Sequence, residues 1–217
     1  MPRKAYSEQE RERIREALLA AALQHIAAHG LKHASVETIC AAVGISKTFF
    51  YSFFPSKEAL VLQALSYQQP KLLAFARTLM NDPKLSWREG LETFLRRCCY
   101  SSSGIAVLSA EEEQMVFRRL SPEEYQAFQR SQLILFGELL AVFGIPVATI
   151  DPRLFGNLAL VIIMVRKAMP EGLPFLFPEM ADEMVSFQIG ALADALERAR
   201  DAKPPHGENR PETENEP

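Results

Sequence analysis

A short stretch near the N-terminus places one cation and three hydroxyl groups around a tight turn, an arrangement suited to contact with phosphates and base edges. The turn reads Gly44-Ile45-Ser46, and Ser46 can cap a following helix whose first backbone amides would face an anion such as phosphate. The side chains that follow this turn and can hydrogen-bond to a polyanion are Lys47, Thr48, Tyr51 and Ser52. These residue types at this spacing predict a surface that binds nucleic acid.

Two short helices must position these side chains. We expect the first over residues 35–43 and the second over residues 46–53, with Gly44 supplying the positive φ of the turn between them. Small residues at positions 40–42 allow the two helices to cross closely. This spacing is typical of a helix-turn-helix, which places its second helix in the major groove of DNA. Helical hairpins with a glycine turn are common in other proteins too, so the spacing alone leaves a different role open.

The rest of the chain also has helical periodicity, and we find no alternating strand pattern, so we expect an all-α fold. A capping box formed by Ser7 and Glu10 begins the first helix, which should run to Gly30. A fourth helix begins near Ser56, and Pro70 should kink or end it because proline lacks an amide proton. Further helices are expected over residues 72–80, 86–100, from 121 onward, 152–169 and 178–202.

The composition is that of an ordinary globular protein, with 48% hydrophobic and 24% charged residues among 217. Residues 1–60 carry eight Lys or Arg against six Asp or Glu, whereas the whole chain has a net charge of −3. A mildly basic N-terminal region followed by an acidic remainder of the chain fits a polyanion partner that binds at the N-terminal end only. The longest apolar run, residues 158–165, is far shorter than the ~20 residues of a membrane span. We therefore expect a cytoplasmic protein with no membrane contact.

The DNA-binding region of the TetR (tetracycline repressor) family of transcriptional regulators resembles residues 35–60, which read SVETICAAVGISKTFFYSFFPSKEAL. The shared features are the Gly-Ile-Ser turn, the Tyr-x-x-Phe of the recognition helix and the Ser-Lys-Glu-x-Leu that follows. The resemblance implies a helix-turn-helix domain at residues 1–60 and an effector-binding and dimerisation domain at residues 61–202. It further implies a homodimer that is paired through the two C-terminal helices. This dimer would bind a palindromic operator in double-stranded DNA and, as is usual in the family, act as a repressor. A small-molecule effector would release it.

The same resemblance implies roles for individual side chains. Tyr51 matches the tyrosine with which the family contacts phosphate, and Lys57 matches its lysine at the start of the fourth helix. Ser35 matches the hydroxyl that opens the second helix. Lys47 and Thr48 match positions at which the family approaches the bases.

Phe49 departs from the family pattern, which usually has a small polar residue at this position. Its ring would remove one contact with the DNA backbone and can instead touch a thymine methyl group. This departure and the low net charge of residues 1–60 support a competing interpretation. In that interpretation the chain is a helical small-molecule-binding or adaptor protein that has lost sequence-specific DNA binding.

Aromatic and sulfur-containing side chains gather on the middle helices, where the effector cavity of the TetR family opens. The candidate pocket residues are Trp87, Phe94, Cys98, Met115, Phe117, Phe128 and Phe136. As a group they favour an apolar or aromatic effector, although any one of them is more often part of a plain core. The acidic run 111–113 can attract a cationic ligand, but a solvated helix face is the simpler interpretation.

No other chemistry is predicted. Cys98 and Cys99 are candidates for a redox sensor, yet burial as small hydrophobic side chains is the favoured interpretation. His25 and His29 share a helix face, but no further ligand completes a metal site. No catalytic motif is present, so we expect neither enzyme activity nor a cofactor. Residues 203–217 hold no apolar side chain and predict a disordered acidic tail.

Overall fold

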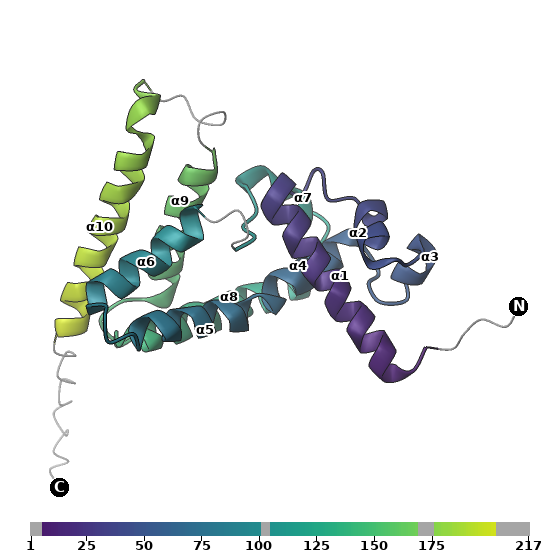
Figure 1. Ribbon diagram of the computed structural model, residues 1–217, viewed down its shortest axis with the longest axis horizontal. Coiled ribbons are helices and arrows are strands. Elements are labelled where there is room, and N and C mark those ends of the chain that lie inside the picture. The colour runs from purple at the N-terminus through teal and green to yellow at the C-terminus, as the bar shows by residue number, and fades with distance from the viewer. Residues whose placement is uncertain (1–5, 101–104, 169–175, 203–217) are drawn as a thin grey trace, which may run out of the picture.

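In a computed structural model that describes residues 6–100, 105–168 and 176–202, every regular element is helical (Figure 1). Helices α1 to α4 lie at one end of the molecule, and α5, α6, α8, α9 and α10 form the other end. The predicted all-α fold is therefore confirmed. The predicted acidic tail lies outside the described residues. No described helix combines the length and the apolar character that a membrane crossing requires.

The N-terminal helices begin where their capping residues are found. Helix α1 spans Glu8–His29 behind the predicted capping box of Ser7 and Glu10. Helix α2 spans Val36–Val43, and the Ser35 hydroxyl accepts a hydrogen bond from the Thr38 amide at 3.0 Å. Each cap satisfies backbone amides that have no partner within the helix. These two helices therefore confirm the predicted boundaries.

The recognition helix is shorter than predicted. Helix α3 spans only Lys47–Phe50, and turns replace the predicted helix over residues 51–53. The following Phe54 stands before Pro55, and a residue before proline is disfavoured in the helical conformation. The rings of Phe50 and Phe54 are both fully buried, with their centroids 5.7 Å apart. Burial of both rings holds α3 and the turns against the N-terminal core.

The fourth helix ends ahead of Pro70, as predicted. Helix α4 spans Lys57–Tyr67, and α5 spans Gln69–Met80 with Pro70 in its first turn, where a missing amide proton costs nothing. Gln68, between the two helices, exchanges two hydrogen bonds with the main chain of Ala106, at 2.9 and 3.0 Å. The junction of the two ends of the molecule is thus held by an amide side chain.

The remaining helices pack around a second core. They are α6 (Trp87–Tyr100), α7 (Ala110–Phe117), α8 (Pro122–Val142), α9 (Pro152–Ala168), a 3-10 turn at Pro178–Met180 and α10 (Ala181–Asp201). Helix α7 begins at a capping box of Ser109 and Glu112 and was not predicted from the sequence. Helix α5 packs on α6 and α8, while α9 contacts α6, α8 and α10. The segment before and including α7 instead packs into the N-terminal core, through Ala106, Leu108 and Val116.

Replacement of Gly44 by alanine should destabilise the protein by about 1–2 kcal/mol, because Gly44 has a left-handed conformation that side chains disfavour. Its φ is 75°, and a Cβ atom there would meet nothing within 4 Å, so the expected cost is that of the backbone alone. Gly137→Ala, inside α8 and equally free of contacts, is the control. It should stabilise by about 0.5–1 kcal/mol. Urea unfolding followed by circular dichroism measures both; equal effects would contradict the prediction.

Candidate DNA-binding surface and effector cavity

Helix α3 presents its polar side chains to solvent. Ser46 caps the helix by accepting a hydrogen bond from the Phe49 amide at 3.2 Å, and Lys47 and Thr48 follow on its exposed first turn. Tyr51, at the end of α3, is 51% exposed. The structure therefore brings these predicted contact residues together on one surface.

Lys47 is paired across the helix-turn-helix with Glu37 of α2. Their hydrogen bond raises the pKa of the Lys47 ammonium and lowers the pKa of the Glu37 carboxyl. Both side chains are more than half exposed, and exposed ion pairs contribute little to stability. The lysine can therefore exchange this partner for a phosphate or a base at low cost.

Phe49 lies in an aromatic cluster that the sequence did not reveal. Its ring stacks on Tyr6 with centroids 4.8 Å apart and meets the edge of Phe53 at 5.0 Å. The guanidinium of Arg11, from α1, lies 4.7 Å from the Phe53 ring centroid and donates to the Ser52 carbonyl at 3.3 Å. The Ser52 hydroxyl donates to the Phe49 carbonyl at 2.7 Å. The cluster joins the start of α1 to the end of the recognition helix.

Ser35 and Lys57 both form hydrogen bonds to other groups of this chain. The Ser35 hydroxyl caps α2 and contacts the Thr38 hydroxyl at 2.6 Å. The Lys57 ammonium donates to the carbonyl of Leu31, in the loop after α1, at 2.7 Å. Partial burial lowers the pKa of Lys57. Lys57 thus ties α4 to this loop, a role that the resemblance alone did not imply.

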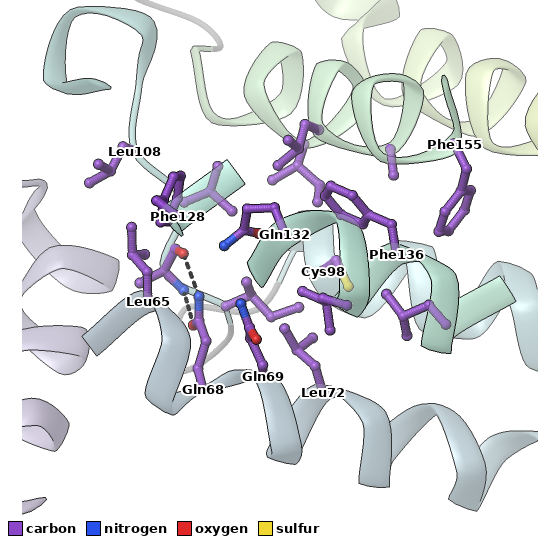
Figure 2. A pocket seen from close by; sticks show the side chains of 18 of the residues that line it. Leu65, Gln68, Gln69, Leu72, Cys98, Leu108, Phe128, Gln132, Phe136 and Phe155 are labelled. Atoms are coloured by element: carbon purple, nitrogen blue, oxygen red, sulfur yellow. Dashed lines mark hydrogen bonds between the residues drawn. The ribbon is translucent and has the colours of Figure 1, made fainter. Parts of the chain in front are cut away.

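An apolar cavity of about 130 Å³ lies between α5, α6, α8, α9 and α7 with the segment that leads into it. In Figure 2 the side chains of Phe128, Phe136 and Phe155 converge with Leu72 and Cys98 around it. Five of the predicted pocket residues line this cavity: Phe94, Cys98, Phe117, Phe128 and Phe136.

Trp87 and Met115 lie outside the cavity. The Trp87 indole donates to the carbonyl of Phe143 at 2.7 Å, and its ring faces the Arg200 guanidinium at 4.3 Å. Met115 is 43% exposed on α7. It is two residues from Phe117, and positions two apart on a helix do not share a face. Both side chains are therefore removed from the set of pocket candidates.

The acidic run on α7 is not one solvated face, because its three carboxylates have different surroundings. Glu111 is exposed and forms an ion pair with Lys32 at 2.6 Å. Glu112 is only 8% exposed and accepts hydrogen bonds from the amides of Leu31 and Ser109. Glu113 lines the cavity, and burial raises the pKa of its carboxyl. The predicted solvated helix face is therefore wrong for Glu112 and Glu113.

The cysteines are buried, as the favoured interpretation predicted. Cys40, Cys98 and Cys99 all have little exposed surface, and burial raises the pKa of the Cys98 thiol. A thiol that resists ionisation is a poor nucleophile and a poor metal ligand. Across the parts of the chain that the structure describes, no three His, Cys, Asp or Glu side chains gather as a metal site would require.

The fold and the exposed, capped recognition helix define the class of this protein: a helix-turn-helix protein with a separate helical cavity. Residues 18–64 match the family model described as bacterial regulatory proteins, tetR family. Residues 18–64 thus match the N-terminal domain of that family, and the chain as a whole has the fold of a TetR-family transcriptional regulator.

Two solved structures illustrate this fold. SCO4454, a TetR-family transcriptional regulator from Streptomyces coelicolor, is 16% identical with a TM-score of 0.54, over 88% of this chain and 97% of that one. The reduced form of NemR from E. coli is 16% identical with a TM-score of 0.50, over 89% of this chain and 98% of that one. No curated protein matches the chain by sequence.

Proposed function

We propose that this protein is a ligand-responsive transcription regulator, a repressor, which binds a palindromic operator as a homodimer and is released by a small apolar or aromatic effector. The observation that carries the proposal is the exposed polar surface of α3 in a chain that also holds an apolar cavity between its other helices. In this proposal residues 1–60 bind DNA, and residues 61–202 bind the effector and dimerise.

Two apolar stripes support dimerisation through the C-terminal helices. On α9 the exposed or half-exposed side chains recur at intervals of four and three residues: Leu154, Leu158, Val161 and Val165. The same spacing begins at Met180, the residue just before α10, and continues on α10 through Met184, Phe187 and Ala191. This spacing keeps the side chains on one face, and an apolar stripe of this kind is stable when another helix covers it. A twofold axis would bring both stripes against their copies in a four-helix interface.

Contacts between the cavity wall and the DNA-binding end support a response to the effector. Ala106 lines the cavity and is bonded to Gln68 at the junction of α4 and α5. On α7, Phe117 lines the cavity while Glu112 holds the Leu31 amide in the loop after α1. A ligand that binds one arrangement of this wall better than another shifts the population of the attached DNA-binding end.

Selection of bound duplexes from a random DNA pool tests the proposal. We expect the selected duplex to be palindromic, with half-sites about one helical turn or more apart. For binding to that duplex, Lys47→Ala should make the slope of log affinity against log salt concentration less steep by about one unit, because one phosphate contact is lost. Lys84→Ala, an exposed lysine far from α3 in the sequence, is the control and should leave the slope unchanged.

Binding that is no tighter than to random DNA would favour the second candidate, a helical small-molecule-binding or adaptor protein. Two observations are consistent with it. Lys47 is already neutralised by Glu37, and Phe49 is engaged with Tyr6 and Phe53 rather than free for a base.

A further inference from the structure

In the part of the chain that the structure describes, the lining of the cavity is apolar apart from four polar side chains: Gln68, Gln69, Gln132 and Glu113. Two of these are already engaged. Gln68 is bonded to the main chain of Ala106, and Gln69 exchanges hydrogen bonds with the Ser131 hydroxyl at 3.1 and 3.3 Å. Figure 2 shows the Gln132 amide between the walls of the cavity. Gln132 and Glu113 are therefore the polar lining groups whose hydrogen-bonding capacity is free for a ligand.

Glu113 differs from the other carboxylates of α7. Among the described residues it has neither an ion-pair nor a hydrogen-bond partner, whereas Glu111 is paired with Lys32 and Glu112 with backbone amides. Among the described residues, the cavity lining contains no Lys, Arg or His that could compensate its charge. A half-buried carboxylate without a counter-charge is unfavourable, and a bound cation would relieve that cost.

Two aromatic rings line the same cavity as this carboxylate. Phe117 follows Glu113 by four residues on α7, so the two side chains lie on the same face of the helix. Phe117 and Phe128 both line the cavity, with their ring centroids 5.6 Å apart. Ring faces attract organic cations, and a carboxylate next to aromatic rings is the chemistry that recognises an ammonium group.

We infer that the effector is a compact organic cation: an ammonium group that pairs with Glu113 beside Phe117, attached to an apolar body that fills the rest of the cavity. The inference rests on the proposed role of the cavity as the effector site. An organic anion such as a carboxylate would meet the charge of Glu113, with no cation in the described part of the lining to receive it. The cavity volume of about 130 Å³ is suited to a body of about one ring.

Isothermal titration of the full chain with three probes of equal size tests the inference. The probes are benzylammonium, benzyl alcohol and benzoate. We expect benzylammonium to bind at least about tenfold more tightly than benzyl alcohol, since a charge-assisted hydrogen bond replaces a neutral one, and benzoate to bind most weakly. Equal affinities for the cation and the alcohol, or no binding of any probe, would overturn the inference.

Two isosteric variants on the same helix locate the cation. Glu113→Gln should remove the tenfold preference and leave the affinity for benzyl alcohol within about twofold, because only the charge changes. Glu111→Gln is the matched control and should keep the preference, since Glu111 is exposed and paired outside the cavity. A preference that survives Glu113→Gln would place the cation elsewhere and overturn the inference. Binding of benzyl alcohol confirms that each variant retains a folded cavity.

Release of the selected operator separates this inference from the proposed function. If benzyl alcohol and benzylammonium release the DNA equally well, the proposed function as a regulator is supported and the inferred preference for a cation is contradicted. If the chain selects no operator while benzylammonium still binds through Glu113, the inferred cation site is supported and the proposed function as a regulator is contradicted.

Discussion

Phe50→Ala should lower the free energy of unfolding by about 3–5 kcal/mol, the usual cost of a large-to-small change at a fully buried phenylalanine. Phe50 has no exposed surface and packs on Phe54 and the edge of Tyr51. It anchors α3 to the core beneath, and loss of this anchor would also release the side chains that are proposed to contact DNA. We therefore expect operator binding to fall with stability.

The neighbouring Phe49→Ala is a matched control, since it removes the same ring from the same helix. Phe49 is only partly buried, in contact with Tyr6 and Phe53, so the expected cost is about 0.5–1.5 kcal/mol for each aromatic pair lost. Urea denaturation followed by circular dichroism gives both values. Equal destabilisation by the two variants would show that Phe50 does not anchor the recognition helix.

Phe187→Asp should convert the proposed dimer into monomers and weaken operator binding by about 100-fold or more. Phe187 is 77% exposed at the centre of the α10 stripe, so the single chain loses little stability when the ring is replaced. At a twofold interface the substitution places two carboxylates in an apolar contact, which is strongly unfavourable. A monomer also loses the gain that comes from joining two half-site contacts, about 10²–10⁴ in affinity.

Sedimentation velocity and operator titration measure the two effects. Ile134→Asp, on α8, introduces the same charge at a side chain that is 62% exposed but outside both stripes. It should leave the dimer and the DNA affinity intact. A Phe187→Asp protein that sediments as a dimer would remove α10 from the proposed interface.

Most helix boundaries could be predicted because their signals are local. A hydroxyl at the N-cap bonds to an amide three residues later, so the caps at Ser7, Ser35 and Ser121 could be read without knowledge of any distant contact. Gly44 likewise has the left-handed conformation that the turn requires. The capping box at Ser109 was an equally local signal, but the eight residues of α7 have no clear apolar stripe and did not predict a helix.

The candidate site was only partly predictable for the opposite reason. The aromatic residues of the pocket were expected as a class, yet Trp87 and Met115 face away from the cavity. Which face of a helix meets a cavity depends on how its neighbours cross it, and one sequence does not specify those crossings. Gln132 carried no signal for the same reason, and Glu113 stood out only as one member of the acidic run 111–113, with nothing to show that it alone meets the cavity.

By itself the sequence determined the all-α class, the caps, the helix-turn-helix and the likeness to TetR-family regulators, because each depends on residues a few positions apart. Only the tertiary structure decided the roles of three successive glutamates on α7. Glu112 meets the amide of Leu31, Glu111 meets Lys32, and Glu113 meets the cavity. The first two contacts join residues about eighty positions apart, so they exist only once α7 has packed against the loop after α1.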